Sequence, residues 1–505
     1  MIAQLTPIAD WLVVVPVVLG LMGGALLLVL RSRLRLQQWL CLVVLLAIFG
    51  SDAALLQRVL AEGPIAMTMG RWLPPFGITF VADVLGAGFA MAAAFVAIVV
   101  LAYLQMDTPE TARRDGIYPL VLLLVAGVSG AFLTGDIFNL YVWFEVILIS
   151  TFGLMALAGN PLQIDGVVKY GLLNFLATSL FLLALGLLYG LLGTLNMADI
   201  MGKAQGADST ALVAIAALLT LAFATKAAAF PVNAWLPASY HTPPAGIAAL
   251  IAGLLTKVGA YALIRILPFM LPGARAVLEP ALVALAAITM VLGPLGAIAE
   301  TKARRIFGFI LIGGIGVIIS GIAMPSIAAV SGAVLYVVHA ILTITALYLI
   351  AGLIERSGGQ LAESWRRTLL SALLLAMLLS AAGIPPFFGF WPKLLLLQGL
   401  LDDGRILHDV NVDWRALILV GAILINAFLT LIAGARLWIR LFWKEPASVA
   451  SEQPRLGLGL GATAFLSCTI IGVGLWPNGL VAAAQLAAMD LLDPAVYVHA
   501  VGLGP

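Results

Sequence analysis

Long apolar runs separated by short polar connections follow one another along the whole chain. A helix that crosses a membrane needs about 20 apolar residues, and fourteen segments come close to this requirement. The predicted spans are residues 8–30, 36–52, 77–105, 117–134, 138–158, 167–193, 211–240, 244–267, 280–299, 306–324, 328–352, 368–401, 414–440 and 457–476. The weaker apolar tail AAAQLAAMDLL predicts an interfacial helix, because Asp490 and Asp493 interrupt it. The pattern predicts an all-α polytopic membrane protein with one membrane-embedded domain, 1–505.

The composition supports this fold class and excludes several functions. Hydrophobic residues make up 63% of the chain and charged residues 10%, whereas soluble domains carry about 25% charged residues. A net charge of +2, without a long basic cluster, predicts no nucleic-acid partner. Cys41 and Cys468 form no CxxC pair, so the sequence predicts neither a metal site nor an iron–sulfur cluster. The N-terminus MIAQLTPIADWLVVV lacks a basic segment, so the first span is expected to be retained.

Basic residues are unevenly divided between alternate loops. If the N-terminus lies outside, the inner loops hold fifteen of the 26 basic residues and the outer side receives seven, among them Arg265 and Arg405. Cytoplasmic loops of membrane proteins carry the excess of lysine and arginine. The sequence therefore predicts fourteen spans with both termini on the outer side of the membrane.

Two of the predicted spans are interrupted by proline. The seventh span contains FPVNAWLP, and the twelfth, five spans later, contains GIPPFFGFWPK. Units of five spans face in opposite directions, so this spacing predicts inverted repeats at residues 117–267 and 280–440. Residues 1–105 are then peripheral helices, and residues 457–505 form the last helix and the tail. Two unrelated proline kinks are the alternative, because membrane helices tolerate them.

Charged side chains occur inside several predicted spans. Four basic residues lie there: Lys169, Lys226, Lys257 and Lys393. Glu145, in FNLYVWFEVILIS, is the carboxylate at comparable depth in the first half of the chain. A charge at the bilayer centre costs roughly 3 kcal/mol or more, so intramembrane charges usually serve a function.

The proline breaks are expected to affect the lysines beside them. Pro231 takes the helical donor from the carbonyl of Ala227, and the paired prolines of GIPPFFGFWPK do the same to Ala381 and Ala382. Carbonyls freed at membrane depth are tolerated only against protein or water. Each break is therefore expected to hydrate the surroundings of its lysine.

These groups form a candidate relay for protons or cations. Burial favours the neutral form of a lysine, and a nearby carboxylate favours the charged form. A proton or cation that passes Glu145 and Lys226 would therefore switch the lysine between a charged, paired state and a neutral state. The proposed hydrated relay consists of Glu145, Lys226, Lys257, His339 and Lys393. Histidine titrates closest to neutral pH, which suits a middle position for His339.

Structural roles are the alternative for most of these residues. Glu145 and Lys226 would then form an ion pair that only joins two helices, and His339 would be a hydrogen-bonded interior histidine. Lys393 and Lys169 would extend their side chains towards the membrane surface.

The sequence leaves open the roles of two polar residues near span ends. His241, in HTPP, is either a proton-uptake group or a polar loop residue. Asp83, in GITFVADVLGAGF, is a candidate partner for an arginine on the outer side.

Signatures of enzymes are lacking in the sequence. GLGLG at 457–461 opens the last span without a preceding strand, which indicates close helix packing rather than a nucleotide loop. The chain has no GxxxxGK[ST] motif and no polar segment long enough to hold a cofactor. We therefore expect no cofactor and no catalytic activity of its own.

The longest motifs resemble a known family. TKAAAFPVNAWLPASYHTPPAGIAALIAGLLTKVGAYALIR and FNLYVWFEVILIS are similar to signatures of the antiporter-like subunits shared by respiratory complex I, membrane-bound hydrogenases and Mrp-type cation/proton antiporters. The resemblance extends over nearly the whole chain and includes both breaks. FNLYVWFE and PASYHTPPAGIAAL most resemble the D-type subunits of Mrp antiporters.

The resemblance implies a module that conducts protons through a central hydrophilic axis. It implies that Glu145 and Lys226 are the coupled pair, Lys257 the bridge and Lys393 the terminal relay residue, with His339 where the family often has histidine or lysine. It further implies Na⁺ and H⁺ as transported ions, the other Mrp subunits as partners in a hetero-oligomer, and a bacterial inner membrane as the location.

Three classes of function are compatible with these features. The first is an ion-translocating subunit of a multisubunit Na⁺/H⁺ antiporter. The second is the proton-pumping arm of a redox enzyme, complex I or a hydrogenase, driven by electron transfer in partner subunits. The third and weakest is a stand-alone transporter of an organic solute.

Overall fold

The chain folds into helices joined by short connections, with one small hairpin. The helices are α1 (Val15–Val29), α2 (Leu34–Glu62), α3 (Val84–Asp107), α4 (Glu110–Arg114), α5 (Ile117–Leu133), α6 (Ile137–Ala156), α7 (Pro161–Leu192), α8 (Met197–Ala204), α9 (Ser209–Ala227), α10 (Trp235–Ser239), α11 (Ala245–Ile264), α12 (Pro272–Ala299), α13 (Ala303–Ala323), α14 (Ile327–Arg356), α15 (Ser364–Ala382), α16 (Phe390–Asp403), α17 (Trp414–Phe442), α18 (Gly457–Leu475), α19 (Asn478–Leu492) and α20 (Ala495–Val501). Two 3₁₀ turns, η1 (Ile8–Val13) and η2 (Met69–Arg71), the π-helix η3 (Arg265–Met270) and the strands β1 (Ile65–Thr68) and β2 (Thr79–Ala82) complete the set.

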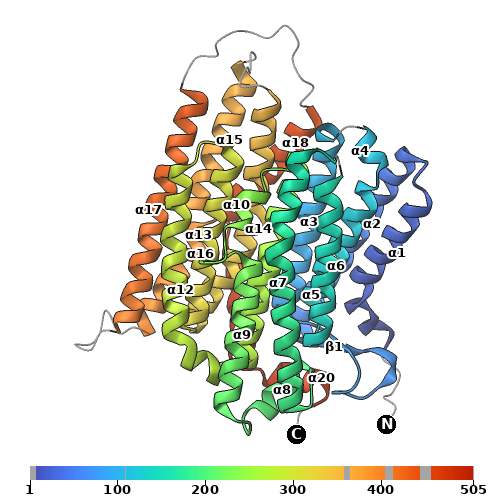
Figure 1. Cartoon of the computed structure of the whole chain (residues 1–505), viewed down its shortest axis with the longest axis vertical. Helices are drawn as coiled ribbons and strands as arrows, with labels where there is room; N and C mark the ends of the chain where they lie inside the picture. Colours follow the sequence, from blue (N-terminus) through green and yellow to red (C-terminus); the bar gives the residue numbers. More distant parts are fainter. Residues whose placement is uncertain are drawn as a thin grey trace.

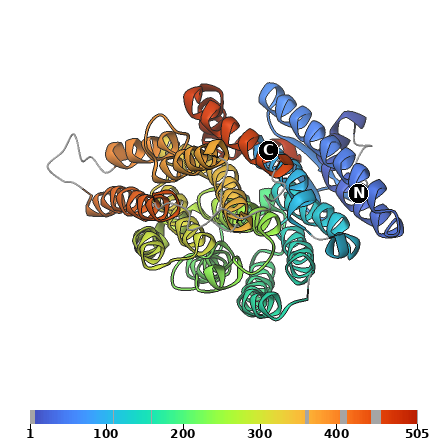
Figure 2. The same ribbon diagram turned by 90° about the horizontal axis from the view of Figure 1, so that it is seen from above.

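The helices of this computed structural model stand side by side in one bundle (Figure 1). The structure describes residues 7–108, 110–157, 159–357, 364–403, 413–443 and 457–503. Seen from above, the bundle is elongated, with α1 and α2 at one edge and α17 at the other (Figure 2). Both chain ends lie at the same end of the bundle (Figure 1), as an even number of crossings requires.

The prediction of an all-α polytopic membrane protein is confirmed. Within the described residues, twelve helices are long and apolar enough to cross a membrane, or thirteen if α19 and α20 form one bent span. The shorter apolar helices α1 and α5 occupy the two predicted spans that these twelve do not cover. Each predicted span thus has its helix, whereas fourteen crossings remains a prediction.

The bundle is organised around α11. All twenty residues of α11 are buried, whereas the edge helices α2, α7 and α17 expose large apolar side chains such as Trp39, Leu172 and Phe428. Lipid tails are as apolar as these side chains, so they need no protein cover in a membrane. α11 contacts α9 and α14, and Lys226, Lys257 and His339 on these three helices are buried, so they face protein rather than lipid.

A hairpin precedes α3 where the sequence suggested only a helix. β2 pairs with β1 in antiparallel register, with Ile65 opposite Ala82. α3 begins only at Val84, because the carboxylate of Asp83 accepts a hydrogen bond from the backbone N–H of Gly86 and caps the helix. The predicted span 77–105 therefore starts with a strand at the end of the bundle that holds both termini.

The apolar tail also differs from the prediction. Instead of lying apart at the interface, α19 packs along α14 and α3 through buried residues that include Ala484, Ala487 and Ala488. Small side chains let helices approach closely inside a membrane. Only α20 turns away, at 77° to α19, and the predicted interruption by Asp490 falls in the last turn of α19.

The first break, between α9 and α10, begins earlier than Pro231. Ala228 adopts a left-handed conformation with φ 62°, and the next N–H, that of Ala229, donates to the carbonyl of Ala224 at 2.8 Å. This geometry ends a helix, although at a non-glycine residue it costs about 1–2 kcal/mol. The helix has therefore already ended at Ala227, and the left-handed turn, not Pro231, removes the donor from its carbonyl.

The second break, between α15 and α16, has a similar backbone. Gly383 is left-handed with φ 86°, and the N–H of Ile384 donates to the carbonyl of Leu379 at 3.0 Å. A proline follows the left-handed residue within three positions at both breaks. The breaks thus share a construction, while the inverted repeat remains a prediction.

Gly259 allows α11 to lie directly against the end of α9. A Cβ at Gly259 would lie 2.7 Å from the backbone nitrogen of Ala227. We expect Gly259→Val to lower the free energy of unfolding by about 1–3 kcal/mol, as overpacking does. The purified protein is heated, and its stability is measured as the fraction of the monodisperse peak that is lost in size-exclusion chromatography. Gly186→Val on α7, where a Cβ meets nothing within 4 Å, is the control, and equal losses would contradict the packing argument.

Candidate functional site

The structure places the predicted relay residues on helices that pack on one another in the middle of the bundle. Glu145 is on α6, Lys226 on α9, Lys257 on α11, His339 on α14 and Lys393 on α16. α11 contacts α6, α9 and α14, and α14 contacts α16. The three lysines and the histidine are at most 5% exposed, whereas Glu145 is only partly buried. Their proximity therefore arises from packing, and their role stays a prediction.

Lys226 lies in an aromatic and polar environment. Its Nζ is 4.7 Å from the centroid of the Phe144 ring, which stabilises a cation electrostatically. Together with Tyr170, Asn174 and other residues, it lines a small cavity. Among the described residues no ion pair joins Lys226 to Glu145, although the charge of Glu145 acts on Lys226. The two residues are neighbours, and the structure does not make them a directly bonded pair.

The end of α9 is held in place by α10. The indole Nε1 of Trp235 donates to the carbonyl of Thr225 at 3.0 Å. The N–H of Phe230 donates to Thr289 Oγ1 of α12 at 3.2 Å. Polar groups exposed by the break are thus partly satisfied by neighbouring helices.

Lys257 is the most enclosed of the lysines, with no exposed surface. Its Nζ donates to the carbonyl of Ala252 in its own helix at 2.7 Å. No ion pair to Lys257 occurs in the part of the chain that the structure describes. This agrees with the sequence, in which no carboxylate was assigned to it.

His339 connects α14 with the second break. Its Nε2 lies 3.1 Å from Ser380 Oγ of α15, and its ring packs against Phe388 with centroids 5.4 Å apart. Gly389 is required here, because a Cβ would collide with the Ser380 carbonyl and lie 2.8 Å from His339 Nε2. Nδ1 has no partner within the described residues. The ring is therefore held at Nε2, while Nδ1 is available for a hydrogen bond or a proton.

Lys393 binds the carbonyls that the sequence predicted to be free. Its Nζ donates to Ala382 O at 2.8 Å and contacts Ala381 O at 3.5 Å. It also donates to Asn426 Oδ1 of α17 at 3.3 Å. At 4% exposure the side chain points into the protein, so the alternative that Lys393 extends to the membrane surface is wrong.

Asn426 was missed in the sequence. Its Nδ2 donates at 2.8 Å to the carbonyl of Met290, which lies four residues before Pro294 of α12 and so lacks a helical donor. The signal was present, since LINAFLT holds one amide in an apolar span and the ninth span contains a proline. Which spans pack together could not be read from the sequence.

The remaining predicted residues lie nearer the ends of the bundle. Lys169 pairs with Asp165 at 2.6 Å, with both side chains about half exposed, so a solvated role is supported. His241 is partly buried in the turn before α11, and its Nδ1 lies 3.0 Å from Pro237 O. Its role in proton uptake remains a prediction.

Arg265 corrects the assignment of the outer loops. It was counted among the basic residues of the outer side, but η3 continues α11 and buries Arg265, which pairs with Asp83 at 2.6 Å. The sequence left the role of Asp83 open, and the structure gives it an arginine of the outer side as its partner. Breaking such a buried pair by removing one partner costs roughly 3–5 kcal/mol. Arg405, from the same predicted set, lies outside the described residues.

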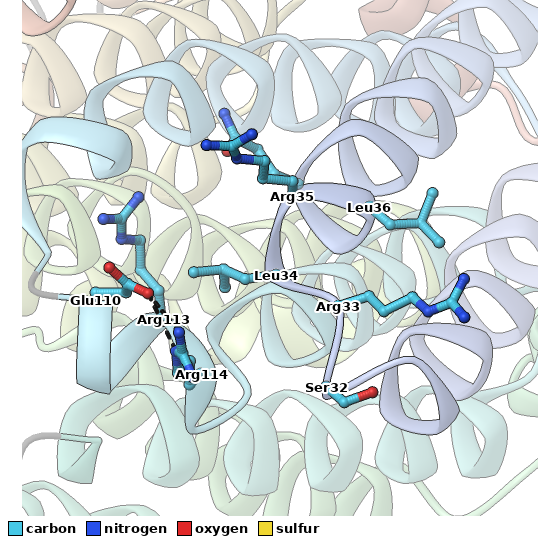
Figure 3. Close-up of a pocket in the computed structure, with 9 residues that line it drawn as sticks. Ser32, Arg33, Leu34, Arg35, Leu36, Glu110, Arg113 and Arg114 are labelled. Atoms are coloured by element: carbon cyan, nitrogen blue, oxygen red, sulfur yellow. Dashed lines mark hydrogen bonds and ion pairs between the residues drawn. The ribbon is translucent and has the colours of Figure 1, made fainter.

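The basic loops gather at the end of the bundle opposite the termini. Between α4 and the turn from α1 to α2, a surface cavity of about 610 Å³ is lined by several arginines, and Figure 3 shows Arg35, Arg113 and Arg114 around Glu110 while Arg33 points away. Arg114 pairs with Glu110 at 2.6 Å. The uneven division of basic residues between alternate loops predicted that one end of the bundle would be basic.

A polytopic bundle with buried lysine and histidine side chains beside two broken helices belongs to the class of membrane proteins that carry ion or proton pathways. Residues 134–424 match the family model described as NADH:quinone oxidoreductase/Mrp antiporter, transmembrane. The chain belongs to this family.

Individual relatives agree with that assignment. The chain is 32% identical over 503 residues to the D-type subunit of the Na⁺/H⁺ antiporter of Bacillus subtilis, an alignment that covers 97% of this chain and 99% of the relative. A chain in the Mrp complex of a Dietzia species superposes with a TM-score of 0.89 at 28% identity, covering 99% of this chain and 100% of that one. A chain of an archaeal membrane-bound sulfane sulfur reductase gives a TM-score of 0.84 at 25% identity, covering 98% and 99%.

The contact of Asn426 with Lys393 and Met290 predicts a stability effect. Asn426→Leu leaves the Met290 carbonyl unsatisfied and takes an acceptor from Lys393, so we expect a loss of about 1–3 kcal/mol in unfolding free energy. The control is Asn174→Leu, since Asn174 donates only to Tyr170 O in its own helix. Thermal unfolding followed by size-exclusion chromatography measures both. Equal losses of stability in the two variants would show that the hydrogen bonds of Asn426 to Lys393 and Met290 add no stability.

Proposed function

We propose that this chain is the D-type, ion-translocating subunit of a multisubunit Na⁺/H⁺ antiporter and conducts protons through its centre. The observation that carries the proposal is the succession of Lys226, Lys257, His339 and Lys393, buried on elements that pack on one another. In this proposal the chain is a transporter subunit rather than an enzyme. The relatives reported above, a D-type antiporter subunit and a chain of an Mrp complex, support it.

The relay works by electrostatic competition between neighbouring cations. Lys257 and Lys393 both act on His339, and three positive charges cannot all be accommodated in a dry interior. A proton that arrives at Lys257 therefore favours release of a proton at Lys393. His339 is suited to transfer between them, because its Nδ1 is free to accept while its Nε2, at Ser380, releases.

The first break supplies the other end of the axis. In this proposal the charge of Glu145 acts on Lys226, and the small cavity beside Lys226 has room for about one water molecule. Proton uptake occurs in this proposal from the basic end of the bundle through His241. The buried hydroxyl of Tyr240, next to His241, has no partner among the described residues and can bind water on this route.

The assembly and location follow from the same assignment. We infer that the partners are the other subunits of an Mrp-type complex, that Na⁺ and H⁺ are the transported ions, and that lipid covers the exposed apolar edges. The chain is a multi-span membrane protein of a bacterial antiporter family. The basic end is proposed to face the cytoplasm and both termini the outer side of the inner membrane, with residues 117–267 and 280–440 as inverted repeats.

A redox-driven proton pump is the second candidate function. The likeness to a chain of an archaeal membrane-bound sulfane sulfur reductase favours it, because that assembly is a respiratory membrane complex. The neighbouring genes separate the two candidates: small membrane subunits alone support the antiporter, and quinone-reductase or iron–sulfur subunits support the pump.

Substitution of the relay lysines tests the axis. We expect Lys226→Ala, Lys257→Ala and Lys393→Ala each to lower Na⁺-dependent proton movement at least roughly tenfold, since each removes a proton-transfer group. The assay is fluorescence quenching of a pH dye in everted vesicles that contain the whole complex, with assembly checked by immunoblot. Lys169→Ala is the matched control, because Lys169 forms an exposed ion pair. Greater damage from Lys169→Ala than from Lys257→Ala would place the axis elsewhere.

The function itself is tested by omitting this chain from the complex. Everted vesicles with the complete complex are expected to exchange protons for Na⁺, and vesicles with the complex lacking this chain are expected to lose that exchange. Parallel measurements with Li⁺ and K⁺ define the cation. Undiminished exchange without the chain would refute the proposed role.

A further inference from the structure

A second line of polar groups leads from the relay to the end of the bundle that holds the termini. Lys257, Tyr261 and Arg265 follow at intervals of four residues and so share one face of α11 and its continuation η3. η3 contacts α19 and α8, and α8 lies at that end of the bundle (Figure 1). A polar line inside an apolar bundle is a path that water and protons can follow.

Arg265 stands across this line and is held from several sides. Its Nη2 donates to Asp83 Oδ1 at 2.6 Å, and its Nε donates to the hydroxyl of Tyr261 at 3.0 Å. That hydroxyl in turn donates to the carbonyl of Phe132 at 2.8 Å. Arg265 is 1% exposed and Asp83 2%. The guanidinium is therefore fixed in place by α3, α5 and its own helix.

Aromatic rings enclose the same guanidinium. Its Cζ lies 5.2 Å from the ring of Tyr261, 5.1 Å from Phe269 and 5.6 Å from Tyr497 of α20. π-Helical turns frequently occur at functional sites. Nη1 of Arg265 has no hydrogen-bond partner among the described residues, so a fixed positive group with one unused donor remains in the line.

The surroundings on the far side of Arg265 are acidic. Asp490, partly buried in the last turn of α19, is close enough to act on both members of the pair. Asp136, the N-cap of α6, acts on Tyr497. These carboxylates attract cations to the end of the line. A fixed positive charge beside them would oppose that attraction.

We propose that the Arg265–Asp83 pair is an electrostatic plug that keeps protons and cations from leaking between Lys257 and the end of the bundle with the termini. Arginine is always charged in proteins and does not pass a proton on. A fixed guanidinium in surroundings of low dielectric repels cations and protons, as an arginine does in water channels. Asp83 holds the guanidinium across the path. This role rests on the proposed function, because a plug needs a conducted ion to retain.

The test measures passive proton leak separately from antiport. Everted vesicles with the whole complex receive an imposed pH gradient in the absence of Na⁺, and the decay of the gradient is followed with a pH dye. We expect Arg265→Met to accelerate the decay on the order of tenfold. Asp83→Asn/Arg265→Gln, which leaves no unpaired buried charge, is expected to leak equally and provides an assembled variant if the single substitution impairs folding.

Lys203→Gln is the matched control. Lys203 forms a partly exposed ion pair with Asp199 on α8, and its substitution removes one positive charge near the same end without touching the line. It is expected to keep the wild-type decay. An assembled double variant with wild-type decay, in vesicles whose wild-type complex exchanges Na⁺ for protons, would overturn the plug alone. A wild-type complex without exchange would instead refute the proposed function.

Discussion

A backbone carbonyl that loses its helical donor inside a membrane must find another donor in the protein or in trapped water, and this requirement shapes the centre of the structure. The second break meets it with a side chain, because Lys393 serves the carbonyl of Ala382. At the first break the carbonyl of Thr225 accepts from the backbone N–H of Ala228 and also from the indole of Trp235. Pro294 of α12 creates the same demand at the carbonyl of Met290, which Asn426 meets. Polar and charged side chains are thus drawn inward because the backbone needs them, and a path for protons can be built from what the breaks already require.

Close packing brings these groups within electrostatic range. α11 is buried along its whole length, and Gly259 lets it touch the backbone at the end of α9. Gly389 similarly lets the second break approach His339. With the helices this close, the charges on Lys257 and Lys393 both influence His339. The spacing of the proposed relay residues therefore depends on small residues that carry no charge themselves.

The sequence predicted the features that depend on a single segment of the chain. It missed the features that depend on two segments packing together. Apolar run lengths located the spans, and proline chemistry identified Ala381 and Ala382 as free carbonyls, which Lys393 binds. The left-handed turn at Ala228 gave no signal, because alanine normally favours helix. Arg265 was counted with the outer side because it lies at the end of an apolar run, and its burial in the π-helix depends on partners from the start of α3 and from α20. Which spans pack together cannot be deduced from hydropathy.

The hydrogen bonds of Lys393 show how one residue can hold a break and still titrate. An ammonium has three donors and a neutral amine has two, and Nζ has three acceptors at 2.8, 3.3 and 3.5 Å. When the proton leaves, the amine can keep Ala382 O and Asn426 and release the longest contact, that to Ala381 O. The freed carbonyl closest to Nζ stays satisfied in both states. A lysine at this position can therefore exchange protons without unfolding the break, whereas an alanine would leave both carbonyls unpaired.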